Sequence, residues 1–187
     1  KPEPGIYRRA GELVGAQNPL AVGDRLETDI MGAVAAGVPA LHVLTGVHQA
    51  RDVIRAPRGQ RPSYLAIDMR GLLEAHPAPK HHRDGTWTCG VSQVAKATRS
   101  GVLTLDDVEL TEPVTISIDS YRALAAAAWE YADGAGSPVT CPDITVVDNE
   151  DPAGIVSQPE PVATSDEDDF YDVAADADNL PEPGAST

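Results

Sequence analysis

The sequence has 187 residues, of which 42% are apolar, and a formal net charge of −15. Its two parts differ in charge: residues 1–100 hold 13 basic and 9 acidic residues, and residues 101–187 hold 1 and 20. Because no basic stripe can neutralise a phosphate backbone, nucleic acid is not expected as a partner. No apolar run reaches the roughly 18 residues of a membrane span, so no membrane partner is expected. We expect no signal peptide, and two widely spaced cysteines favour a cytoplasmic protein over a disulfide scaffold.

The first expected element is a helix over residues 5–14, whose apolar residues, among them Leu13 and Val14, recur at helical spacing. Pro4 occupies a position where a first-turn proline is tolerated. Lys1 then lies just before a helix N-terminus, a place that favours anions. Taken by itself, Lys1 is more simply a solvated terminal lysine.

The rest of the chain is expected to be organised around the stretch AVGDRLETDI, residues 21–30. Its apolar start runs into Gly23 and Asp24, which is typical of a strand buried on both faces of a parallel sheet. Asp24 therefore lies at the carboxyl end of that strand, where open α/β sheets bind ligands. Asp29 follows about one and a half helical turns later and can stay near Asp24. Two carboxylates at this edge suit Mg²⁺, although turn and capping roles are the alternative.

A helix over residues 29–36 and a strand over residues 40–44 are expected next, and this spacing predicts a right-handed βαβ unit. We assign no role to His42, which lies inside the expected strand. His48 follows the strand and is expected to be a loop residue, although it could reach a substrate.

Four arginines follow within residues 48–62. Arginine binds phosphate well, but their spacing fixes no single concave site, so a solvated loop is the preferred interpretation. A short strand over residues 64–67 and a helix over residues 69–75, with Leu72 and Leu73 buried, are expected to complete this part.

Residues 77–85 have the composition of a linker, and residues 86–136 predict a small α+β module. Its clearest element is a helix over residues 121–132, which Ser120 would cap and whose apolar face follows the helical period. That face could pack in the module itself, against the preceding part, or against a second subunit in a homo-oligomer. Residues 137–187 are expected to be a largely disordered acidic tail, because from residue 146 onward no basic residue balances the acidic ones.

Three motifs together resemble the haloacid dehalogenase (HAD) superfamily. Lys1-Pro2, the octet GDRLETDI at residues 23–30, and AAGVPALHVLTGV at residues 35–47 follow one another in the family's order. The likeness is strongest to the branch of 4-nitrophenyl phosphatases, phosphoglycolate phosphatases and NagD-type enzymes, and it covers about residues 1–75. It implies an α/β fold: a partial Rossmann-like parallel sheet with flanking helices, in which residues 1–76 are the C-terminal part of the hydrolase core.

The resemblance also implies an activity, a Mg²⁺-dependent hydrolysis of a small phosphate monoester such as glycerol phosphate or phosphoglycolate. Enzymes of this kind form an aspartyl-phosphate and then hydrolyse it, while a neighbouring acid protonates the leaving group. By resemblance, Asp24 would bind Mg²⁺, and Asp29 would hold a metal-bound water or orient Lys1. Lys1 would offset the negative charge of the phosphoryl group.

The sequence departs from the family pattern in what precedes Lys1. The nucleophile and the acid of the family form an Asp-x-Asp motif on the first strand, and a cap domain is inserted upstream of the lysine; neither is present here. We therefore expect this chain to be a C-terminal fragment that is inactive alone and has exposed sheet edges. The alternative is a non-catalytic Rossmann-like scaffold whose second module and acidic tail bind a protein or a ligand.

Overall fold

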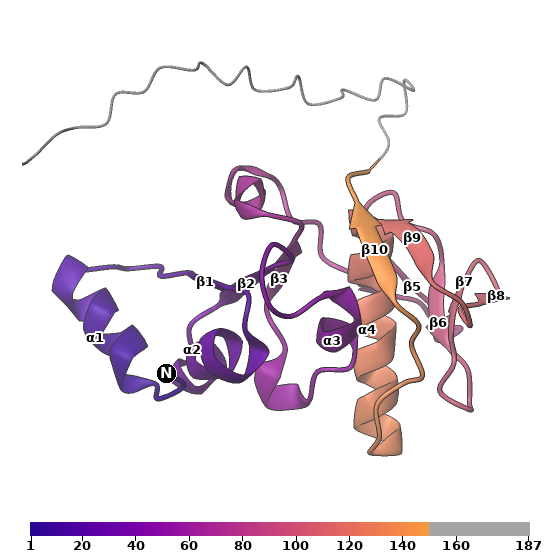
Figure 1. The fold of residues 1–187 in the computed structure, drawn as a ribbon, viewed down its shortest axis with the longest axis horizontal. Coiled ribbons are helices and arrows are strands. Elements are labelled where there is room, and N and C mark those ends of the chain that lie inside the picture. Colours follow the sequence, from indigo (N-terminus) through magenta and orange to yellow (C-terminus); the bar gives the residue numbers. More distant parts are fainter. Residues whose placement is uncertain (150–187) are drawn as a thin grey trace, which may run out of the picture. The chain divides into compact units, whose positions relative to one another are not determined.

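The computed structural model describes residues 1–149, and the tail expected to be disordered lies mostly outside these described residues (Figure 1). The first helix, α1 (Gly5–Val14), has the predicted bounds and ends at Gly15, whose φ of 61° is left-handed. An apolar helix face usually packs against a core, but this one is not buried: Leu13 is 68% exposed and Val14 is 78% exposed.

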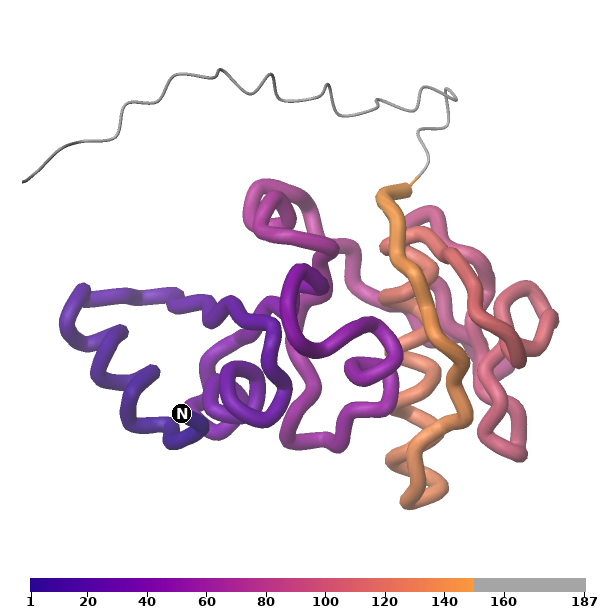
Figure 2. The backbone as a smooth tube through the Cα atoms, in the orientation of Figure 1, coloured from indigo at the N-terminus to yellow at the C-terminus, as the bar shows by residue number. Residues whose placement is uncertain are grey.

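A three-stranded parallel sheet forms the centre of residues 1–76, as predicted. Its strands are β1 (Ala21–Gly23), β2 (Ala40–Val43) and β3 (Tyr64–Ala66), in the order β1-β2-β3. β1 and β2 pair in register from Ala21 opposite Ala40 to Gly23 opposite His42, so the two strands end at the same edge of the sheet. Figure 2 follows the backbone through these elements from the N-terminus onward. Two short helices, α2 (Met31–Ala36) and α3 (Ala50–Ile54), flank the sheet.

Two helices differ from the prediction. The one expected over residues 29–36 begins earlier, as a π-helical turn η1 (Leu26–Ile30) that runs into α2, because the carbonyl of Arg25 accepts from both Asp29 N and Ile30 N. The one expected over residues 69–75 is a 3-10 turn, η3 (Met69–Leu73), which follows another short turn, η2 (Arg58–Gln60). Leu72 and Leu73 are 45% and 93% exposed, so the prediction that they are buried was wrong; so short a turn presents no continuous apolar stripe to a core.

The following residues form an antiparallel sheet and a βαβ unit. The sheet has the order β4-β5-β6-β7-β8. Its strands are β4 (Lys80–His81), β5 (Trp87–Thr88), β6 (Ala95–Ala97), β7 (Leu103–Leu105) and β8 (Val108–Glu109). The βαβ unit consists of β9 (Val114–Ser117), α4 (Ile118–Ala135) and β10 (Ile144–Val147), whose strands are parallel.

The structure corrects three sequence expectations in this part. The expected linker contains β4, and the start of the expected tail contains β10, so pairing extends beyond both boundaries. Helix α4 begins at Ile118 and is capped by Ser117, whose Oγ accepts from Ser120 N at 3.2 Å, rather than by Ser120. The division into modules near residues 76 and 86 stays a prediction.

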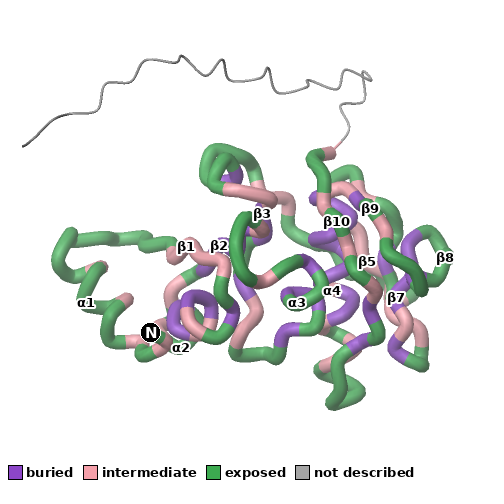
Figure 3. Tube along the Cα trace, viewed as in Figure 1, coloured by how far each residue is buried: buried purple, intermediate pink, exposed green. Residues whose placement is uncertain are grey.

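Helix α4 joins the two sheets into one hydrophobic core. Tyr121, Leu124 and Ala128, three members of the predicted apolar stripe, are fully buried. Figure 3 shows buried residues along α4. The helix contacts β5, β6 and β7 on the side of the antiparallel sheet and α3 and β3 on the side of the parallel sheet. Trp129 completes the second contact by donating from Nε1 to the carbonyl of Val53 at 3.0 Å.

Three of the four arginines of residues 48–62 pair with aspartates of the later part of the chain. Arg51 pairs with Asp143 at 3.1 Å. Arg58 and Arg61 both pair with Asp133 near the end of α4, at 3.3 Å and 2.8 Å. Neither sequence interpretation, a phosphate-binding loop or a solvated loop, included these contacts, because their partners lie more than 70 residues away. Among the described residues, no helix combines the length and the apolar character needed to cross a bilayer.

A buried arginine links α4 to the middle of β3. Arg122, whose side chain is 6% exposed, donates from Nη1 to Asp119 Oδ1 at 2.9 Å. Its Nε and Nη2 donate to the carbonyl of Leu65 at 3.2 Å and 3.0 Å, and Nη2 also lies 3.2 Å from His76 Nδ1. The guanidinium thus pairs with a buried carboxylate and also satisfies a buried carbonyl.

Replacing Arg122 by Leu is expected to lower the free energy of unfolding by about 3–5 kcal/mol, because the substitution leaves the buried Asp119 carboxylate and the Leu65 carbonyl without this donor. Urea unfolding measures the loss. Arg99→Leu, at an exposed position, is the matched control and should change stability by less than about 0.5 kcal/mol. Equal stabilities of the two variants would contradict the role given to Arg122.

A second prediction concerns His42, which is fully buried in β2. Burial lowers the pKa of His42 from 6.5 to about 4. Below pH 6.5 the unfolded chain therefore binds a proton that the folded chain does not, so stability falls as the pH drops toward 4, by roughly 3 kcal/mol. His42→Gln, which can keep a donor toward the Asp24 carbonyl, should lose this component, and His82→Gln, at an exposed position, should not. Urea unfolding between pH 4 and 7 tests both; parallel pH curves for wild type and His42→Gln would contradict the prediction.

Candidate active site

Asp24 lies directly after β1, and the loop after β2 holds it in place. The backbone N–H of Val47 donates to Asp24 Oδ2 at 2.7 Å, and the backbone N–H of His48 donates to the Asp24 carbonyl at 3.1 Å. The Val47 N–H holds the pKa of Asp24 below its usual value of 3.8, so the carboxylate is charged at neutral pH. A Cβ on Gly46 would collide with the Asp24 carboxylate, so this contact requires glycine in the loop.

Asp29 lies in the turn η1 and is 9% exposed. Its Oδ1 accepts from Lys1 Nζ at 2.7 Å, and its Oδ2 accepts from the backbone N–H of Arg25 at 3.3 Å. A Cβ on Gly23 would collide with the Asp29 side chain. Each of the two aspartates therefore packs against a glycine at the end of a strand, and the structure brings together the three residues that the sequence proposed for the site.

Lys1 carries the positive charge of this group. Its hydrogen bond to Asp29 raises the pKa of Lys1 above 10.5, against an opposing effect of partial burial, and the charge of Asp24 contributes to the increase. The Lys1 side chain remains 50% exposed. The ammonium is thus charged at neutral pH, placed by one carboxylate and still accessible to a ligand.

A tyrosine that sequence reasoning missed anchors the segment that carries Lys1. Tyr7, in α1, donates from its hydroxyl to the carbonyl of Asp29 at 2.9 Å. Its ring lies over Gly32 in α2, where an added Cβ would be 2.5 Å from the ring and 2.8 Å from the carbonyl of Pro2. The only sequence signal for this contact was the helical spacing of α1, which does not identify a partner.

The two carboxylates fit part of a Mg²⁺ site. Within residues 1–149, no group of three or more His, Cys, Asp and Glu side chains could hold a metal ion. Mg²⁺ does not need such a group, because it is usually bound by one or two carboxylates, and waters and substrate phosphate supply its other ligands. Asp24 and Asp29, both at the carboxyl edge of a parallel sheet and next to a lysine, match that kind of site better than an all-protein metal cage.

Gly32→Ala tests how Lys1 is held. The added methyl group is expected to displace Tyr7 and the Pro2 backbone and to destabilise the fold by about 1–3 kcal/mol, as overpacking does. Chemical denaturation measures the loss. Gly11→Ala in α1, where an added Cβ meets nothing within 4 Å, is the control and should be neutral or slightly stabilising. A Gly32→Ala variant as stable as wild type would show that α1 does not depend on this contact.

Comparisons with known proteins address the family. A family model described as HAD-hydrolase-like matches residues 1–72. D-glycerol 3-phosphate phosphatase of Mycobacterium tuberculosis is 36% identical over 130 residues, which are 70% of this chain and 36% of that protein. The chain therefore spans little more than a third of the length of this curated relative.

Two crystal structures of glycerol phosphate phosphatase from Mycobacterium tuberculosis are similar to this chain. The complex with magnesium is 29% identical, with a TM-score of 0.48, and the complex with calcium is 28% identical, with a TM-score of 0.49. Each match covers 80% of this chain and 40% of the other. The family match over residues 1–72 and the sequence similarity agree with the motifs around Asp24, which resemble those of HAD-type hydrolases.

Proposed function

We propose that this chain provides the lysine and the metal-binding carboxylates of a Mg²⁺-dependent phosphatase that acts on a small phosphate monoester. The observation that carries the proposal is the contact of Lys1 with Asp29 at 2.7 Å, with Asp24 at the same sheet edge. Glycerol phosphate is the first substrate to test, because a similar protein is named a D-glycerol 3-phosphate phosphatase.

Each residue has a separate role in the proposed reaction. Asp24 would bind Mg²⁺, which when bound would neutralise charge on the phosphate oxygens. Asp29 would have both roles that the resemblance allowed: its Oδ1 orients the Lys1 ammonium through the 2.7 Å contact, and its Oδ2 would hold a metal-bound water. Lys1 offers its positive charge to the phosphoryl group in the transition state, a type of stabilisation that dominates phosphoryl transfer.

In this proposal the aspartate nucleophile comes from a further segment of the complete protein, and the chain alone is inactive. Two surfaces support the idea of a further segment. Among the described strands β1 pairs only with β2, which leaves its other edge without a neighbour, and α1 has no buried residue. A cleft of about 290 Å³ lies between these parts, lined by Tyr7, Val14, Ala21 and other residues.

The non-catalytic scaffold is not favoured, because the similar proteins are named phosphatases. The second module also offers no anion site at the start of α4: the Ser117 hydroxyl and the Asn149 side chain already accept the N–H groups of Ser120 and Asp119, and the buried Asp119 carboxylate would repel an anion. A cytoplasmic location, the lack of a nucleic-acid partner and a homo-oligomer stay predictions.

Mg²⁺ binding is the direct test in this chain. Addition of MgCl₂ at about 100 times the dissociation constant is expected to stabilise the fold by about 2.7 kcal/mol. Asp24→Asn should abolish this stabilisation, because it removes a charged ligand. Asp84→Asn, at an exposed aspartate outside the site, is the matched control and should respond like wild type. If Asp24→Asn were stabilised as much as wild type, Asp24 would not be a metal ligand.

Activity is tested in the complete protein, with glycerol phosphate and phosphoglycolate compared. Replacing the lysine equivalent to Lys1 by Met is expected to lower kcat by about 100-fold or more, as loss of a single electrostatic donor in an active site does. The Asp84→Asn protein should keep wild-type kcat. If neither substrate is hydrolysed, both are excluded, and other phosphate esters are the next to test. Full activity of the lysine variant would show that Lys1 has no part in the mechanism.

A further inference from the structure

We infer that His48 is a positioning residue that fixes the turn between Asp24 and Asp29 and thereby sets the metal affinity of the site. The inference rests on the proposed function, since it concerns the same two carboxylates. The sequence suggested only a loop histidine that could reach a substrate, and the geometry gives this side chain a different role.

His48 contacts three positions of the segment that joins the two aspartates. Its backbone N–H donates to the Asp24 carbonyl at 3.1 Å, its Nδ1 lies 3.1 Å from Leu26 N, and its Nε2 lies 3.3 Å from Glu27 Oε2. Because the backbone N–H of Leu26 can only donate, Nδ1 must be the unprotonated acceptor. The proton of the neutral ring is then on Nε2, where it faces the Glu27 carboxylate.

The turn η1 needs this acceptor from outside. The first N–H groups of a helix have no partner within the helix. Arg25, which precedes η1, makes no capping bond with its side chain, so His48 takes the place of an N-cap residue for Leu26. Since η1 has only five residues and Asp29 is the fourth of them, fixing Leu26 also fixes the direction in which Asp29 leaves the turn.

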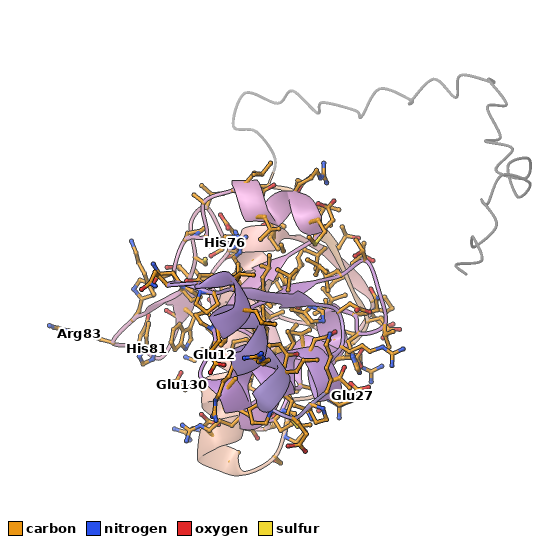
Figure 4. All side chains as sticks on the ribbon, turned by 90° about the vertical axis from the view of Figure 1, so that its left-hand side faces the viewer. Glu12, Glu27, His76, His81, Arg83 and Glu130 are labelled. Carbon is orange, nitrogen blue, oxygen red and sulfur yellow. The ribbon has the colours of Figure 1, made fainter. Side chains whose placement is uncertain are left out.

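The neighbouring residue extends the same control to Asp24. The backbone N–H of Val47 donates to the Asp24 carboxylate. Residue 47 therefore holds Asp24 directly, and residue 48 holds Leu26, the first residue of the turn that carries Asp29. This arrangement resembles the support of metal ligands by residues around them, whose loss typically weakens metal binding by about 10–100-fold. In Figure 4, Glu27 lies on the opposite side of the view from His81 and Glu130.

His48 differs from a residue that only stabilises the fold. Its side chain is 23% exposed and that of Glu27 is 49% exposed, so the contact between the neutral ring and the Glu27 carboxylate is near the surface and contributes little to stability. The contact with Leu26 instead fixes a backbone position between the two carboxylates. We therefore expect loss of the imidazole to affect Mg²⁺ affinity more than thermal stability.

The test compares variants of the 187-residue chain by two readouts: the dissociation constant for Mg²⁺, from calorimetry or thermal shift, and hydrogen exchange of the Leu26 amide. His48→Ala is expected to raise the dissociation constant about tenfold and to speed exchange at Leu26 by a similar factor. His48→Asn places an amide oxygen near the position of Nδ1 and should restore both values to within about threefold of wild type. His82→Ala, at an exposed histidine outside the site, is the matched control.

A second variant covers the case in which His48→Ala does not fold. His48→Gln keeps a polar side chain of similar size but moves the acceptor away from the position of Nδ1, so it should show the same weakened Mg²⁺ binding. If His48→Ala or His48→Gln speeds exchange at Leu26 but leaves the dissociation constant within twofold of wild type, His48 is only a cap and the inference is overturned, while the proposed function stands. If wild type itself binds no Mg²⁺, the proposed function fails, and the inference fails with it.

Discussion

The site depends on close contact between carboxylates and glycines at the ends of two neighbouring strands. Gly23, at the end of β1, lies against the Asp29 side chain, and Gly46, after β2, lies against the Asp24 carboxylate. Any larger side chain at these two positions would occupy the space of a carboxylate. The parallel pairing of β1 and β2 brings both contacts to one edge, so the sheet register, the glycines and the aspartates act as one constraint. Lys1 joins this group only because Asp29 is held there.

Sequence reasoning identified the elements with local signals and missed the contacts between distant ones. Continuous apolar runs that end in a glycine predicted β1 and β2, and the resemblance named Lys1, Asp24 and Asp29 together. A two-residue strand such as β4 has no periodicity from which to predict it. The exposure of Leu72 and the pairing of Arg61 with Asp133 also depend on which distant surfaces meet, and spacing along the chain carries no information on that. Tyr7 and His48 belong to the same class, since both act on backbone groups more than 20 residues away.

The interface around α4 connects the second half of the chain to the first through buried contacts. Arg122 satisfies a carbonyl of β3, and Trp129 satisfies one of α3, so one helix provides partners for backbone groups of the preceding part. Leaving such groups unsatisfied in a buried interface costs more than the bonds themselves contribute. The hydrophobic core therefore runs from Ile30 and Val53 to Leu103 without a break. Folding of the parallel sheet and folding of the second module are coupled by this geometry.

Stability and site geometry rest on different residues as a consequence. The largest fully buried side chains include Tyr121 and Leu124, which α4 packs against both sheets. The site is arranged instead by single hydrogen bonds near the surface, which Val47 and Tyr7 donate and the His48 ring accepts, and each contributes only about 1 kcal/mol to stability. Such bonds can direct a carboxylate without controlling whether the chain folds. Substitutions among them can therefore change ligand binding in a protein whose fold α4 maintains.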